Sequence, residues 1–163
     1  MERKLRLAGQ ILDAAGKFRH IEIAGPPTLE VWEEAFDVMQ TAFIMLDILD
    51  LGTMTLYRKK IVDYHNQYGP STWLLLYQTD VRFRHEKVEK VKRELVRAHA
   101  LAVTAAGTTP YDDNRPWNYT YVKGMADKEW WDKQFRDPAM LYLNKLAQLQ
   151  ACLLYTSPSP RDS

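Results

Sequence analysis

The chain has 163 residues, of which 46% are hydrophobic and 26% are charged, and its formal net charge is +1. These proportions are typical of one folded domain with a sizeable core, and they exclude an intrinsically disordered protein. Because the overall charge is near zero, a role in nucleic-acid binding would have to rest on local clusters of basic residues. Cys152 is the only cysteine, which excludes an internal disulfide and a zinc site built from cysteines.

Membrane and secretory signals are not evident in the sequence. The first residues are charged and lack the apolar block of a secretory signal. The most apolar run, residues 42–49, is far shorter than the roughly 20 residues needed to cross a bilayer. We therefore expect an intracellular protein, cytoplasmic or nuclear, with no membrane partner.

The N-terminal segment, residues 2–18, predicts an amphipathic helix. Its apolar residues are spaced three and four apart, which is typical of one helix face: Leu5, Ala8, Leu12 and Ala15. A short extended piece at Ile21 and Ile23 should follow, because Pro26 and Pro27 prevent the helix from continuing.

A second helix is predicted from Thr28, whose hydroxyl can cap the first turn. Large apolar residues form one narrow stripe along it: Leu29, Trp32, Phe36, Met39, Phe43 and Leu46. Residues 50–52 indicate a stop, with Gly52 in the left-handed conformation that is common just after a helix. A third helix, carrying an aromatic stripe, should run from Thr53 to Tyr68.

The longest predicted element is a helix over about residues 72–106, which Ser71 would cap and in which no glycine or proline occurs. Its apolar seam follows a heptad pattern: Leu74, Tyr77, Val81, Arg84, Val88, Val91, Leu95, Ala98, Ala102 and Ala105. Two interpretations remain open. The seam can cover the core of an intramolecular bundle, which we favour, or residues Val81, Val88, Val91, Leu95 and Ala98 can mediate self-association.

The remainder, residues 107–151, predicts a loop followed by a short C-terminal helical pair that packs on the bundle of residues 1–106. Asp127 can cap the first helix of the pair, which carries Trp130 and Trp131. Asp137 and Pro138 are a favourable start for the second, residues 139–150. The predicted fold class is therefore all-α, a helical bundle with one long central helix.

Catalytic chemistry is not predicted. The Tyr111-Asp112-Asp113 triplet lacks the flanking hydrophobic strands that would aim two carboxylates at a metal ion. The four histidines show no spacing typical of a zinc site, and no phosphate-binding loop or nucleophile elbow occurs. We predict no catalytic residue, no metal, no cofactor and no small-molecule substrate.

Basic residues are concentrated between positions 82 and 97, a stretch that contains seven basic and three acidic residues. The basic ones are Arg82, Arg84, Lys87, Lys90, Lys92, Arg93 and Arg97. Together with Arg58, Lys59 and Lys60 they could form a continuous surface for the phosphate backbone of RNA. The alternative interpretation is a solvated helix face with internal ion pairs such as Glu86 with Lys90. The tryptophans Trp73, Trp117, Trp130 and Trp131 fit a buried core better than base stacking.

Several motifs resemble a helical region of mobile-element-like open reading frames from dinoflagellate transcriptomes. These are Leu29-x-x-Trp32-x-x-x-Phe36, residues 41–46, Tyr64-x-x-x-Tyr68-Gly69, Trp73-x-x-x-Tyr77-x-x-Asp80-x-Arg82-x-Arg84, residues 110–118 and Trp130-Trp131. The resemblance implies a gag-like, upstream part of a larger polyprotein that assembles and packages RNA. A protein-interaction or scaffold domain without a nucleic-acid role is the alternative.

Residues 152–163 resemble the in-frame translation of a transposase-type sequencing adapter. We therefore expect the natural sequence to depart from this one at about Ala151, and residues 152–163 to be a disordered, non-native tail. Without Cys152, the natural part would also contain no thiol nucleophile.

Overall fold

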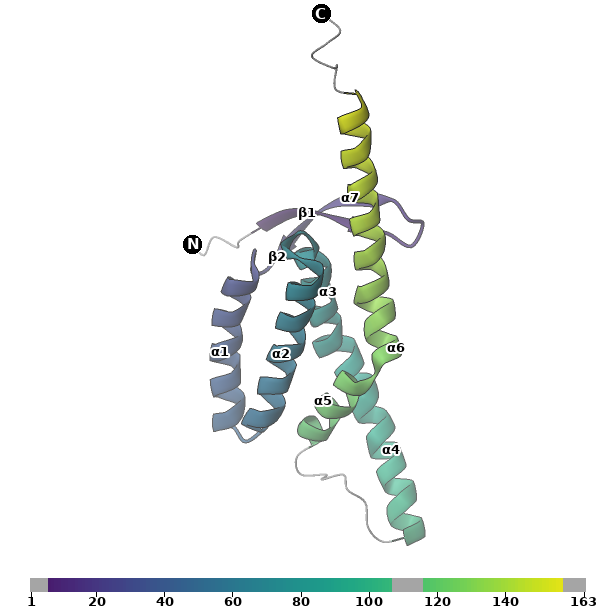
Figure 1. The fold of residues 1–163 in the computed structure, drawn as a ribbon. Coiled ribbons are helices and arrows are strands. Elements are labelled where there is room, and N and C mark those ends of the chain that lie inside the picture. Colours follow the sequence, from purple (N-terminus) through teal and green to yellow (C-terminus); the bar gives the residue numbers. More distant parts are fainter. Residues whose placement is uncertain (1–5, 107–115, 157–163) are drawn as a thin grey trace, which may run out of the picture.

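The computed structural model describes residues 6–106 and 116–156 (Figure 1). It confirms an all-α helical bundle, to which a small β-hairpin is added at the N-terminal end. The elements are β1 (Arg6–Leu12), β2 (Phe18–Ala24), α1 (Leu29–Met45), α2 (Leu51–Tyr68), α3 (Trp73–Arg82), α4 (Val88–Ala106), α5 (Pro116–Ala126), α6 (Lys128–Trp131) and α7 (Asp137–Thr156).

The N-terminal hairpin replaces the predicted helix over residues 2–18, and that prediction was wrong. Strands β1 and β2 pair antiparallel, from Arg6 opposite Ala24 to Leu12 opposite Phe18. The Asp13 carboxylate accepts hydrogen bonds from the backbone amides of Ala15 and Lys17, and Gly16 adopts a φ of 76°. This local turn chemistry favours a hairpin, and the helical spacing depended on alanines that bury little.

Helices α1 and α2 lie side by side, joined by a short turn (Figure 1). The predicted cap is confirmed, since the Thr28 hydroxyl accepts from the amide of Val31 at 3.4 Å. The predicted stop at Gly52 was wrong, because α1 already ends at Met45, Asp47 takes the positive φ of 54°, and Gly52 lies in the first turn of α2. Asn118 of α5 supplies the cap of α2 by accepting from the Asp50 amide at 3.1 Å.

The predicted long helix is present as a continuous helical segment from Trp73 to Ala106, interrupted by one π-helical turn at Phe83–Lys87. Ser71 does not cap it; a 3₁₀ turn, Pro70–Thr72, precedes it instead. The π turn adds a residue, so the buried face departs from the predicted heptad before the turn and coincides with it after the turn, at Val88, Val91 and Leu95. The buried side chains are Trp73, Leu75, Leu76, Thr79, Asp80, Phe83, Val88, Val91 and Leu95.

The C-terminal half contains helix α5, which was not predicted, and one long helix in place of the predicted pair. Asp127 does cap this long helix, accepting from the Trp130 amide at 3.1 Å. The break at Pro138 was wrong, because a π turn over Asp132–Arg136 carries the helix directly into α7. Since Pro138 has no N–H to offer the preceding turn, the Gln134 carbonyl accepts the Thr79 hydroxyl of α3 at 3.2 Å.

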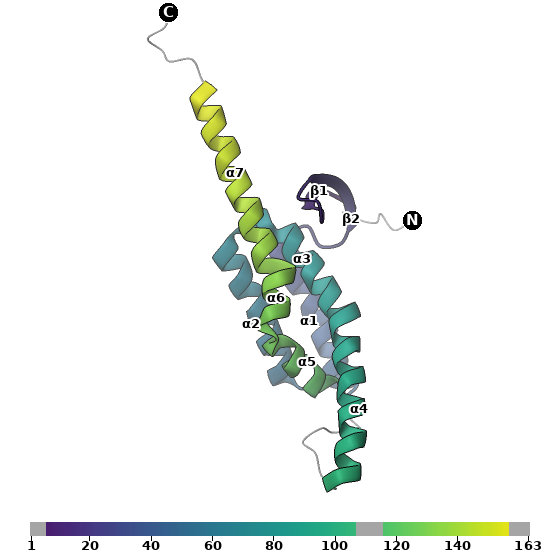
Figure 2. The same ribbon diagram turned by 90° about the vertical axis from the view of Figure 1, so that its right-hand side faces the viewer.

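Helix α7 continues to Thr156, so residues 152–156 are helical and not disordered, with residues 152–155 exposed. The remaining residues of the predicted tail lie outside the described part of the chain. In Figures 1 and 2, the second half of α7 extends beyond the bundle as a single helix.

The core is aromatic and lies between α1, α2, α3, α5 and the α6 region. Tyr57, Phe83, Trp131 and Phe135 are fully buried, with ring centroids of Tyr57 and Phe83 5.0 Å apart and those of Phe83 and Trp131 5.1 Å apart. Each such side chain contributes roughly 1.5–3 kcal/mol of burial free energy. The core interpretation of the tryptophans therefore holds for Trp131 and for Trp73, which is 5% exposed.

Candidate interaction surfaces

The first predicted basic group, residues 58–60, is occupied by contacts inside the protein. Arg58 bridges two carboxylates of α1, with nitrogen–oxygen distances of 2.6 Å to Glu33 and 2.5 Å to Asp37. Hydrogen bonding to Glu33 raises the pKa of Arg58 and outweighs the opposing effect of partial burial. Lys59 pairs with Asp63 one helical turn away.

The second predicted group is likewise divided among internal partners. Arg84 points into the bundle and pairs with Asp80 at 2.7 Å, and Lys87 pairs with Asp127 at the start of α6. Arg82 donates to the side-chain oxygen of Gln134 at 2.8 Å. Lys92 lies 4.1 Å from the ring centroid of Trp117, a cation–π contact. The structure therefore does not merge residues 58–60 and 82–97 into one continuous basic surface.

Four of the predicted RNA-binding residues remain exposed without an acidic partner in the described part of the chain: Arg82, whose partner Gln134 is neutral, and Lys90, Arg93 and Arg97. The last three are spaced three and four residues apart, which places them on one face of α4. Glu86 and Glu94 are exposed on the same helix and reduce the positive potential there. What remains is a narrow basic stripe rather than a broad patch.

The predicted self-association seam is largely inside the fold. Val88, Val91 and Leu95 are buried, with 2%, 3% and 6% of their surfaces exposed, and α4 packs on α5. Val81 is half-buried and Ala98 is exposed. The intramolecular interpretation of the seam is therefore correct for its three central residues, which are not available to a second chain.

A buried polar network joins α1, α2 and α3 around Asp80, which is 0% exposed. The Asp80 carboxylate accepts from the Trp32 indole at 3.0 Å, from the Tyr57 hydroxyl at 2.5 Å and from Arg84 at 2.7 and 3.1 Å. Burial, followed by the Asp80 charge, raises the pKa of Tyr57 well above its ordinary value. Asp80 and Tyr57 are both 0% exposed, and their hydrogen bonds connect α1, α2 and α3 inside the bundle.

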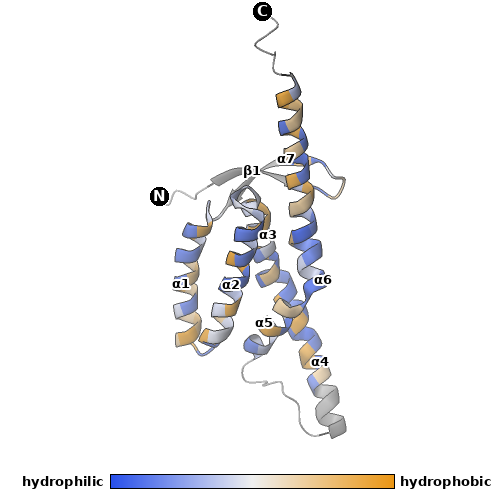
Figure 3. Cartoon of the chain, in the orientation of Figure 1, coloured by the Kyte–Doolittle hydropathy of each residue, from blue (hydrophilic) through white to orange (hydrophobic). Residues whose placement is uncertain are grey.

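The projecting part of α7 presents apolar side chains to solvent, visible as orange bands in Figure 3. The exposed ones in this part are Leu149 (58%), Leu153 (69%), Leu154 (80%) and Tyr155 (95%), and Met140 (50%) and Leu141 (42%) are exposed near the start of α7. The hairpin covers only the middle of the helix, where Lys145 donates to the Gly16 carbonyl at 2.6 Å and Phe18 packs against Tyr142. From Leu146 to Thr156 the sequence contains no charged residue.

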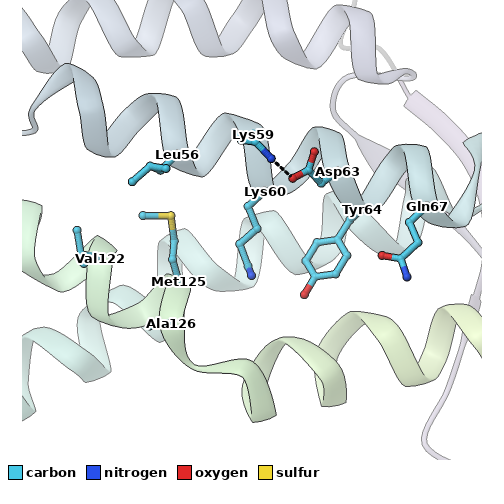
Figure 4. Close-up of a pocket in the computed structure, with 9 residues that line it drawn as sticks. All are labelled: Leu56, Lys59, Lys60, Asp63, Tyr64, Gln67, Val122, Met125 and Ala126. Atoms are coloured by element: carbon cyan, nitrogen blue, oxygen red, sulfur yellow. Dashed lines mark hydrogen bonds and ion pairs between the residues drawn. The ribbon is translucent and has the colours of Figure 1, made fainter.

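A groove of about 480 Å³ lies between α2 and α5 (Figure 4). Leu56, Val122 and Met125 supply apolar side chains, and Lys60 and Tyr64 project into it from α2. Neither this groove nor the α7 surface was predicted from the sequence. The groove depends on residues from two distant helices, whereas the leucine spacing of α7 was a signal that the assumed break at Pro138 obscured.

Metal ligands do not cluster in the described residues, where no group of three or more His, Cys, Asp or Glu side chains could hold an ion. No helix in the same residues has the length and apolar character needed to cross a membrane. Comparison with family models, with curated proteins and with solved structures finds no match for this chain.

Proposed function

We propose that this protein is a non-enzymatic helical assembly module of a larger, mobile-element-type polyprotein, and that α7 pairs with a second copy of the chain. The observation that supports this proposal most strongly is the projection of α7 beyond the bundle with apolar, uncharged residues on its surface. The polyprotein context follows from the motif resemblance described above.

The physical argument concerns the stability of a single helix in water. An isolated helix of this length is marginal, and most helical stability in proteins comes from packing an apolar face. Beyond Tyr142, which packs against the hairpin, Leu146, Leu149 and Leu153 follow gaps of three and four residues, the spacing of a coiled-coil seam. Pairing of two such seams would cover the apolar face.

The charge pattern favours a second copy as the occupant. The segment after Lys145 has no charge with which to select a charged partner, and it presents no like-charge repulsion to a copy of itself. The proposal rests on Leu146 and Leu149, which precede the adapter-like residues.

The test is sedimentation equilibrium of the full chain over a wide concentration range. We expect a dimer that Leu146→Glu combined with Leu149→Glu converts to a monomer. Met140→Glu, an apolar-to-charged change at an exposed residue on the face of α7 away from Leu146 and Leu149, is the matched control and should leave the dimer intact. Truncation after Ala151 should also retain it. A monomer at every concentration, or equal dissociation by Met140→Glu, would refute the proposal.

RNA binding is a second candidate, favoured by the exposed stripe of Lys90, Arg93 and Arg97. Contact with about three phosphates would give a slope of roughly −2 in a plot of log affinity for single-stranded RNA against log salt concentration. Reversing the three charges should abolish binding, whereas Lys59→Glu, at a residue paired with Asp63, should have little effect. If RNA binding were unchanged after the three charges are reversed, a scaffold domain without a nucleic-acid role would be the better description.

A further inference from the structure

The groove between α2 and α5 has one polar and one apolar half. Leu56 of α2 with Val122 and Met125 of α5 form the apolar half (Figure 4). The polar half is formed by residues of α2: Lys59, Lys60, Asp63, Tyr64 and Gln67. The groove volume of about 480 Å³ lies within the range of small-molecule sites, which are mostly apolar with a few placed polar groups.

Lys60 differs from its neighbours Arg58 and Lys59 on α2 because it lacks a carboxylate partner. Its ammonium nitrogen lies 5.1 Å from the ring centroid of Tyr64 and 4.9 Å from that of Trp131, and it forms no ion pair in the described part of the chain. Aromatic faces attract a cation but do not satisfy its three N–H donors as oxygen acceptors do.

The neighbouring carboxylates are already engaged by other cations. Asp63 pairs with Lys59 at 2.6 Å, and Asp132 pairs with Lys128 at 2.6 Å and with Arg136 at 3.2 Å. Their fields reach Lys60, but desolvation by burial is the larger effect and lowers the pKa of Lys60. The groove therefore contains a partly desolvated positive charge that a bound anion would neutralise.

We infer that this groove binds a small amphipathic monocarboxylate, with the carboxylate on Lys60 and the apolar body against Leu56, Val122 and Met125. Lys59 also lines the groove, but its ion pair with Asp63 neutralises it, so Lys60 supplies one uncompensated positive charge that matches one carboxylate. None of the residues that line the groove is an arginine, the side chain that recognises phosphate groups through paired N–H donors. This inference is independent of the assembly role proposed for α7.

The experiment is an NMR titration of the isotope-labelled full chain with decanoate, and with decanol as the uncharged analogue. Decanoate should saturate and shift the signals of Leu56, Lys60, Val122 and Met125, and decanol should bind at least about tenfold more weakly. Lys60→Met should weaken decanoate binding about tenfold while Lys60→Arg largely retains it. The control, Lys90→Met at an exposed lysine of α4 that does not line the groove, should bind decanoate as the unmodified protein does.

Three outcomes would overturn the inference. They are equal affinity for decanoate and decanol, unchanged decanoate affinity in Lys60→Met, and absence of saturable shifts in the groove. Thermal unfolding of each variant shows whether it is folded. If Lys60→Met does not fold, Lys60→Gln replaces it, and the comparison of decanoate with decanol on the unmodified protein tests the inference without any variant.

Discussion

Arg84 and Asp80 form an ion pair inside the bundle, one helical turn apart. Arg84 donates Nε to one carboxylate oxygen at 3.1 Å and a terminal nitrogen to the other at 2.7 Å. The side chain of Asp80 is 1% exposed and that of Arg84 is 27% exposed. Burial alone would lower the pKa of Arg84, but the Asp80 charge raises it overall. The hydrogen bonds that Asp80 accepts from Trp32 of α1 and Tyr57 of α2 connect α3 to both helices, and Arg84 balances the Asp80 charge.

Asp80→Asn should destabilise the protein by about 2–3 kcal/mol. Asparagine keeps the shape, but its single carbonyl oxygen can accept from only one of Trp32 and Tyr57, which donate to different oxygens of Asp80. It also leaves the partly buried Arg84 charge uncompensated. Urea denaturation followed by circular dichroism measures the change. The matched control is Asp63→Asn, which removes an exposed pair and should change stability by less than about 0.5 kcal/mol. Equal effects of the two variants would contradict the structural role of Asp80.

Thr79→Val should cost about 1 kcal/mol. The Thr79 hydroxyl is shared between the Leu75 carbonyl at 2.9 Å and the Gln134 carbonyl at 3.2 Å, which Pro138 leaves without a helical N–H donor. Valine matches the shape of threonine but removes the donor from a buried acceptor. Thr79→Ser keeps the hydroxyl and should lose less. The comparison of the two variants by urea denaturation isolates the hydrogen bond from the methyl packing.

Local chemistry explains what the sequence predicted correctly. The Thr28 and Asp127 caps and the long segment without glycine or proline depend on neighbouring residues only, and each is present. The errors arose where two signals competed. In the first segment a helical spacing with two alanines competed with the turn-forming Asp13 and Gly16, and the turn prevailed.

Tertiary placement explains what the sequence could not predict. The π turn at Phe83–Lys87 shifts the buried face of its helix, and the π turn at Asp132–Arg136 continues a helix through Pro138. The spacing of apolar residues in the sequence does not predict either turn. Lys60 was assigned to a basic surface because residues 58–60 are consecutive. The fold directs Arg58 to α1 and Lys60 to the aromatic rings of Tyr64 and Trp131.

Gly124→Ala should destabilise the protein by about 1–2 kcal/mol, although alanine is the better helix former. A Cβ at Gly124 would lie 2.9 Å from the Phe83 ring, which is fully buried and cannot move away easily. Gly52→Ala is the matched control, because its Cβ would meet nothing within 4 Å. It should stabilise α2 by about 0.5–1 kcal/mol. Thermal and urea unfolding of the two variants should therefore change in opposite directions.

The Lys87–Asp127 pair should make part of the stability dependent on acid pH. The hydrogen bond from Lys87 lowers the pKa of Asp127, helped by the amide of Trp130. In the acid range the unfolded chain therefore binds a proton at Asp127 more readily than the folded protein does. The contribution is complete above the ordinary aspartate value of about 3.9 and declines as the pH falls through the lowered folded pKa.

Asp127→Asn tests this, because asparagine retains the helix cap and removes only the charge. The difference in unfolding free energy between the unmodified protein and this variant should be constant between pH 7 and 5 and should shrink below about pH 4. Lys87→Met should remove the same dependence, and the double variant should show no further loss. A difference that stays constant down to pH 2 would mean that Lys87 does not bond Asp127 in solution.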